Sequence, residues 1–166
     1  MLHSKIDIDL IEWSIYETAY GVANKVPDQL KKLYSSNKEE QLNAAHDLWC
    51  GLCHQHAYIS SASLPAYPFL KKVLTNANEE LMIELLDIFA GFAVCSAVQH
   101  PEGHGQLQKD MRKLLNMDFD FFKKIEKIEG EEEFAELITE QIEKNAYKFK
   151  NFRSLRSLGR AKARPF

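Results

Sequence analysis

Long hydrophobic runs are missing from this chain of 166 residues, and no window approaches the ~18 uninterrupted apolar residues of a membrane-spanning helix. Asp7 and Asp9 stand where a signal peptide needs an apolar stretch, so we expect neither export nor a membrane span. Cysteine is also scarce: three residues, an odd number within apolar stretches, indicate reduced thiols and no disulfide framework. These absences predict a cytoplasmic protein.

Proline and glycine are few, with five and seven residues, and no segment alternates apolar and polar residues for long. Apolar residues recur instead at spacings of three and four, the helical pattern. Because 45% of the residues are hydrophobic and 27% charged, the chain can fill a core and solvate a surface. The sequence therefore predicts a folded all-α protein, and its length fits one domain.

The chain resembles itself at an offset of 40 residues. Five matched segments carry this similarity: Leu30 to Leu33 with Leu70 to Val73, Glu39-Glu40 with Glu79-Glu80, Asp47 with Asp87, Leu48 with Ile88, and Gly51 with Gly91. A period near 40 is typical of HEAT and armadillo repeats, in which each helical hairpin buries its apolar face against its neighbour. We expect a short right-handed α-α superhelix of about three hairpins.

The expected helices follow from capping residues and apolar stripes. They comprise a first hairpin (about 27 to 35 and 38 to 55), a second (about 65 to 75 and 79 to 97), a third unit with a helix at about 118 to 128, and a capping helix at 131 to about 150. Pro27 and Pro68 suit the first turns of the leading helices. An N-terminal helix carrying Ile8, Ile11 and Ile15 on one face closes the other end. The domain covers residues 1–150, and residues 151–166 form a basic tail.

Several short strings within about residues 10 to 95 resemble small bacterial HEAT-repeat proteins. They are Ala19-Tyr20-Gly21, Val26-Pro27, His54-Gln55 and Pro68-Phe69-Leu70, with Trp13, Leu30, Tyr58 and Ala66 between them. The resemblance implies a non-enzymatic binding solenoid. Some compact bacterial helical-repeat proteins of this size act as immunity proteins that block a toxin domain, which makes that role a hypothesis for this chain.

The string from Cys50 to His54 has the Cys-x-x-Cys-His spacing of covalent haem attachment. It aligns, however, with Ala90 to Val94 in the next repeat, which holds no cysteine, so we interpret it as a helix interior. Zinc binding by Cys50, Cys53, His54 and His56 would need a break in the helix after His54. The loop from His100 to Gly105 is interpreted as an exposed turn. We expect no catalytic residue, cofactor or metal.

Charge is distributed unevenly along the chain. Eight basic residues and no acidic one follow Glu143, which leaves 13 basic against 24 acidic residues before it, a formal charge of about -11. An acidic body attracts a basic partner and repels nucleic acid and anionic membranes. An acidic surface that serves solubility alone remains the alternative.

Six residues form the expected partner-binding set: Glu40, Asp47, His54, Glu80, Glu84 and Asp87. The acids follow helical spacing on the second helix of each hairpin, and equivalent positions align in a stacked solenoid, so we expect adjacent acidic columns. The alternative is that Asp47 and Asp87 bond neighbouring helix ends, or the lysine pairs Lys31-Lys32 and Lys71-Lys72, and only hold the repeats together.

These observations lead to a hypothesis of a monomeric, non-enzymatic immunity protein whose acidic face binds a basic bacterial toxin domain, such as a nuclease. The alternative is a nucleic-acid-binding helical-repeat protein that uses its basic tail, where aromatic residues alternate with lysine and arginine.

Overall fold

The computed structural model describes residues 7–128, 130 and 132–160, with side-chain surroundings through residue 146. Seven α-helices make up most of this part: α1 (Val26–Lys32), α2 (Lys38–Cys53), α3 (Ser63–Leu74), α4 (Glu79–Cys95), α5 (Gln106–Met117), α6 (Phe119–Ile125) and α7 (Glu132–Arg160). The short elements are η1 (Ile8–Leu10), η2 (Trp13–Ile15), β1 (Glu17–Thr18), β2 (Gly21–Val22) and η3 (His54–His56). The expected all-helical class is confirmed for the described residues, apart from the small hairpin.

The two long helices of the expected hairpins begin where the capping residues predict. The Asn37 side chain accepts a hydrogen bond from the Glu40 backbone N–H at 3.2 Å, and Asn78 does the same for Leu81 at 3.0 Å. Each asparagine thereby satisfies one of the backbone donors that a helix start leaves unpaired. Acidic residues in both first turns add a favourable interaction with the helix dipole.

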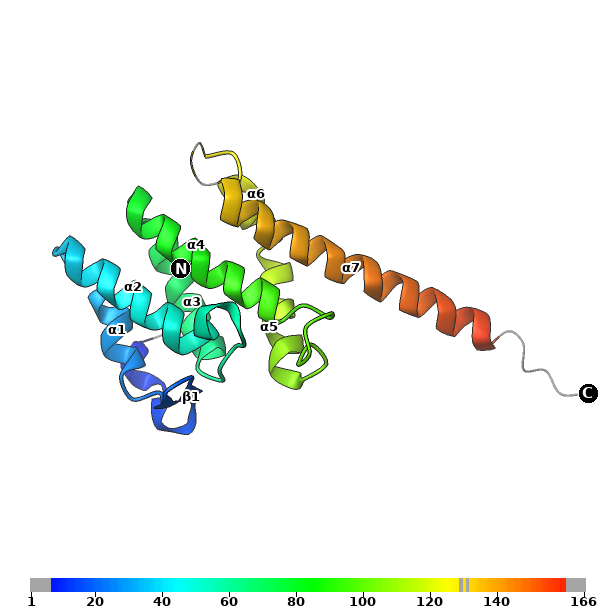
Figure 1. The fold of residues 1–166 in the computed structure, drawn as a ribbon, viewed down its shortest axis with the longest axis horizontal. Helices are drawn as coiled ribbons and strands as arrows, with labels where there is room; N and C mark the ends of the chain where they lie inside the picture. The colour runs from blue at the N-terminus through cyan, green and yellow to red at the C-terminus, as the bar shows by residue number, and fades with distance from the viewer. Residues whose placement is uncertain (1–6, 129, 131, 161–166) are drawn as a thin grey trace, which may run out of the picture.

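Helices α2 and α4 lie side by side and run in the same direction (Figure 1). Lys38 at the start of α2 reaches Glu80 at the start of α4, and Cys53 at the end of α2 lies against Gly91 near the end of α4. Helix α1 packs on α2, and α3 packs on α4. The two segments at 38–53 and 79–95 therefore stand in equivalent orientations.

Helix α4 is the centre of the core. Its side chains Leu85, Leu86, Ile88, Phe89 and Phe92 are almost entirely excluded from solvent. It contacts α2, α3, α5 and α7, which explains why its apolar residues are not confined to one stripe. The Phe89 ring also contacts the rings of Tyr67 in α3 and Phe122 in α6, at centroid distances of 5.1 and 5.3 Å, so both helices join the same core.

The prediction of an N-terminal helix is wrong. Residues 8–22 form two 3-10 turns and a hairpin, because local side-chain bonds favour a tight turn over a helix. The Thr18 hydroxyl donates to the Gly21 carbonyl at 3.0 Å and accepts from the Tyr20 N–H at 3.2 Å. Gly21 adopts φ +109°, which L side chains rarely do. Ile15, which belonged to the apolar face of the expected helix, is 64% exposed.

Pro27 lies in the first turn of α1 as predicted, whereas Pro68 lies inside α3, which begins five residues earlier at Ser63. The third unit also differs from a regular hairpin, since α5 and α6 are separated by a break at Asp118. That carboxylate accepts bonds from the Tyr67 hydroxyl at 3.0 Å and the Lys71 ammonium at 2.5 Å, which tie the break to α3.

Helix α7 packs on α4 and α6 through Ala135, Ile138 and Ile142. It is longer than the expected capping helix, and its C-terminal half extends beyond the rest of the protein (Figure 1). Of the expected basic tail, residues 151–160 continue this helix and residues 161–166 lie outside the described part. Among the described residues, no helix combines the length and apolar character required to cross a bilayer.

The equivalent glycines of α2 and α4 give a matched test of this packing. A Cβ atom at Gly91 would lie 2.6 Å from Cys53 Sγ and 2.9 Å from His56 Cδ2, whereas at Gly51 its nearest neighbour, Thr18 Cβ, is 3.5 Å away. Gly91→Ala should lower the free energy of unfolding by about 1–3 kcal/mol through overpacking. Gly51→Ala should raise it by about 0.5–1 kcal/mol because alanine favours helix. Urea denaturation measures both, and a Gly91→Ala protein as stable as the wild type would contradict the close approach.

Candidate partner-binding surface

The acidic row of α4 faces the preceding hairpin. Asp87 Oδ1 lies 2.7 Å from His56 Nε2, and both side chains are 26% exposed. The same imidazole nitrogen also lies 2.9 Å from the Asp87 carbonyl oxygen. Glu80 pairs with Lys38 at 2.5 Å, but this pair is well exposed and contributes little to stability. Glu80 and Asp87 thus both contact the preceding hairpin, and for Asp87 this is the kind of contact between repeats that the alternative interpretation describes.

The equivalent row of α2 faces the N-terminal hairpin and α1. Gly51 lies against Thr18, and its carbonyl accepts the Ala19 N–H at 2.8 Å. Glu40 accepts a bond from the Ser35 hydroxyl at 2.5 Å. Asp47 is exposed, and its side chain makes no hydrogen bond or ion pair within the described part of the chain. The carboxylate that corresponds to Asp87 is therefore available to an external cation.

Asp47 stands at the junction of two shallow hollows, with volumes of about 450 and 370 Å³, that also share Gln29. The first hollow is further lined by Thr18, Tyr20, Val22, Asn24, Lys25, Val26, Cys50 and Gly51, and the second by Lys32, Asn37, Glu39, Glu40, Asn43 and Ala44. We call the combined feature the Asp47 groove. Its polar lining includes carboxylates, amides, hydroxyls and two lysines, which suits hydrogen bonding to a protein surface.

Exposed apolar and aromatic side chains form the rim of this groove. Tyr20 is 69% exposed and Val22 is 53% exposed, although both belong to an ordered hairpin. The Tyr20 and His54 rings form a T-shaped contact with their centroids 6.0 Å apart, and His54 in turn packs on Tyr58 at 5.0 Å. Aromatic residues of this kind often dominate binding energy at protein interfaces. His54 therefore supports the rim of the groove without lining it.

The chain turns sharply after α2, which ends at Cys53 and not at residue 55. His54, Gln55 and His56 all adopt positive φ angles of +42°, +53° and +66°. Such a run costs free energy in residues other than glycine. The turn is held by later residues, because the Ser63 hydroxyl donates to the Leu52 carbonyl at 2.8 Å and the Ser60 N–H donates to the same carbonyl at 2.9 Å.

The groove brings together only part of the expected set. Glu40 and Asp47 line it, while Glu84 lies half-buried on α4, apart from it. Tyr20, Val22 and Gln29 also line the groove, although the sequence did not predict them as binding residues. A tyrosine immediately before a glycine in a polar turn was the available signal, since such a side chain has no core to enter.

The described cysteine and histidine residues are spread over separate surroundings. Within residues 7–128, 130 and 132–160, no group of three or more histidine, cysteine or acidic side chains could hold a metal ion. Cys50 Sγ lies 3.7 Å from His46 Nε2, whereas Cys53 Sγ donates to the Trp49 carbonyl at 3.2 Å, so the two thiols have different surroundings. His100 Nε2 lies 2.9 Å from the Ala57 carbonyl oxygen and anchors the loop that follows.

Comparison with known proteins gave no match: none was found to a protein-family model, to a curated protein or to a solved structure.

The three free thiols should differ in reactivity. Burial raises the pKa of Cys53 and of Cys95 to about 12, so little reactive thiolate exists at pH 8 in the folded protein, whereas Cys50 is only half-buried. We expect a thiol reagent such as 5,5′-dithiobis(2-nitrobenzoate) to label Cys50 alone at pH 8, and all three cysteines after denaturation. The variant Cys50→Ser should lose the native reaction. Rapid native labelling of this variant would contradict the burial of the other two.

Proposed function

We propose that this chain is a non-enzymatic protein-binding module, built as a short HEAT-like helical stack, that binds a basic protein in the Asp47 groove. One observation carries the proposal. Asp87 of α4 receives the imidazole of His56 from the preceding hairpin, while the equivalent Asp47 of α2 has no partner among the described residues and faces solvent. A lysine or arginine from another protein would occupy the corresponding place.

Charge and shape favour a protein over a nucleic acid at this surface. Residues 7–58 carry eight acidic side chains against four lysines, so the field around the groove repels phosphate and attracts cations. The groove is shallow and its rim presents Tyr20 and Val22, which supply apolar area that a protein partner can bury. Charged residues at such a rim mainly accelerate association, while desolvated aromatic residues slow dissociation.

More specifically, we propose that the chain is an immunity protein for a basic toxin domain, such as a nuclease. A nuclease binds phosphate with lysine and arginine, so an acidic, aromatic-edged surface complements its active site. Occlusion of that site would require no catalytic residue in this chain.

The binding surface can be tested by charge reversal at Asp47. Wild type and Asp47→Lys are expressed with an affinity tag in the source cells, and co-purifying proteins are quantified by mass spectrometry. We expect a basic protein whose recovery falls at least about tenfold with Asp47→Lys, because like charges across an interface are unfavourable. Glu133→Lys, an exposed change on α7, is the matched control and should leave recovery unchanged. Equal recovery with both variants, or recovery of nucleic acid in place of a protein, would contradict the proposal.

The immunity form has a separate readout. The recovered basic protein, expressed alone in a test host, should arrest growth; co-expression of the wild type should restore growth, and co-expression of Asp47→Lys should not. A recovered partner without toxicity would overturn the immunity form and leave the binding surface intact.

A further inference from the structure

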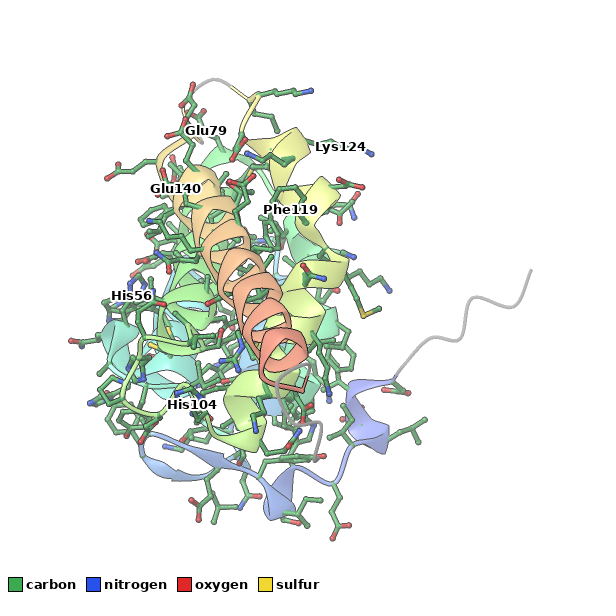
Figure 2. All side chains as sticks on the ribbon, turned by 90° about the vertical axis from the view of Figure 1, so that its right-hand side faces the viewer. His56, Glu79, His104, Phe119, Lys124 and Glu140 are labelled. Atoms are coloured by element: carbon green, nitrogen blue, oxygen red, sulfur yellow. The ribbon has the colours of Figure 1, made fainter. Side chains whose placement is uncertain are left out.

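A second concave surface lies between α5 and α7, away from the Asp47 groove. Its main cleft has a volume of about 540 Å³, within the range of small-molecule sites. The described lining residues are Ala93, Gln106, Lys109, Arg112, Lys113, Leu115, Asn116, Ile142, Asn145 and Ala146. In Figure 2, α7 lies in front of the other helices, with Phe119 of α6 on one side of it and His56 on the other. The cleft shares no lining residue with the Asp47 groove and is therefore a separate feature.

One wall of the cleft is cationic. Lys109, Arg112 and Lys113 are separated by three and four residues, so they share one face of α5. Arg112 is only 8% exposed, and its guanidinium donates to the carbonyl oxygens of Ser96 and Gly103. These bonds hold a permanently charged group in place. None of the described lining residues is acidic.

The floor of the cleft is apolar and continues into a second hollow. Ala93, Leu115, Ile142 and Ala146 supply the apolar surface. The second hollow has a volume of about 380 Å³, shares Asn116, Ile142 and Ala146 with the first, and reaches Met117, which is 79% exposed. Together the two hollows form an elongated groove beside α7.

The charge along this groove changes sign from one end to the other. The cleft end carries the three cations of α5, whereas the second hollow carries Asp120 and Glu143. An anion is therefore attracted to the first end and repelled from the second. Asp110 pairs with Lys113 at 3.0 Å and offsets part of its charge, and the Arg112 guanidinium is already bonded to two carbonyl oxygens. The charge most open to a ligand is therefore that of Lys109, which suits a singly charged headgroup.

We propose that this groove binds a small amphiphilic carboxylate, such as a fatty acid of medium length. The carboxylate lies among Lys109, Arg112 and Lys113, and the alkyl chain follows Ile142 and Ala146 towards Met117. Each half of this arrangement rests on a separate observation: basic side chains line one end of the groove, and apolar side chains that the two hollows share lead away from that end. The proposal is independent of the protein-binding role of the Asp47 groove.

Isothermal titration calorimetry with decanoate, below its micelle-forming concentration, tests the inference on the full chain. We expect one bound decanoate per chain, an affinity that falls as salt rises, and at least tenfold weaker binding of decyltrimethylammonium, which has the same chain and the opposite charge. Equal affinity for the two amphiphiles would overturn the proposal, as would no binding of decanoate. Binding of decyl phosphate more than tenfold tighter than decanoate would overturn the assignment of a carboxylate.

Two variants locate the site. Lys109→Glu with Lys113→Glu should weaken decanoate binding at least tenfold, while Lys72→Glu with Lys127→Glu, the same change of charge at exposed lysines elsewhere, should leave it within twofold. Ala146→Trp, at an exposed position on α7, should block the apolar part and weaken binding similarly without loss of the folded state. Circular dichroism verifies folding for each protein. Unchanged affinity in the first variant and in Ala146→Trp would place the ligand elsewhere and overturn the proposal.

Discussion

The contact between the end of α2 and the C-terminal half of α4 determines how the two hairpins pack. Gly91 permits α4 to approach Cys53 and His56 so closely that a Cβ atom would meet Cys53 Sγ at 2.6 Å. The same approach places the imidazole of His56 2.7 Å from the Asp87 carboxylate. Because α4 is the centre of the core, this one junction fixes how the first hairpin stacks on the second, and therefore where the row of α2 faces solvent.

The contact between the two hairpins could be predicted from the sequence, because the residues that repeat are those that packing and helix capping require. The glycines at an offset of 40 residues both lie where a helix approaches the preceding element, and Asn37 and Asn78 both cap helices. The sequence could not predict the run of left-handed residues from 54 to 56. None of these residues is the glycine or asparagine that usually indicates such a turn. The turn is held instead by hydrogen bonds from Ser60 and Ser63.

The candidate site was predictable in part for the same reason. The equivalence of Asp47 and Asp87 follows from the repeat, but their different surroundings depend on what precedes each helix. The hairpin at Glu17–Val22 replaces an expected helix, leaves Asp47 open to solvent and adds Tyr20 to the rim. The cleft beside α7 could not be predicted, because its walls come from helices joined by no repeat and its shape depends on their packing.

The two hairpins are joined through His56 and Asp87, and α2 presents the same acidic position, Asp47, with no side-chain partner among the described residues. A double-mutant cycle with His56→Ala, Asp87→Ala and the combined variant, followed by urea denaturation, tests this junction most directly. We predict a coupling free energy of about 1 kcal/mol or more between these two residues. Single-variant effects that add to within about 0.3 kcal/mol would contradict the junction, and with it the basis for assigning a cation to Asp47.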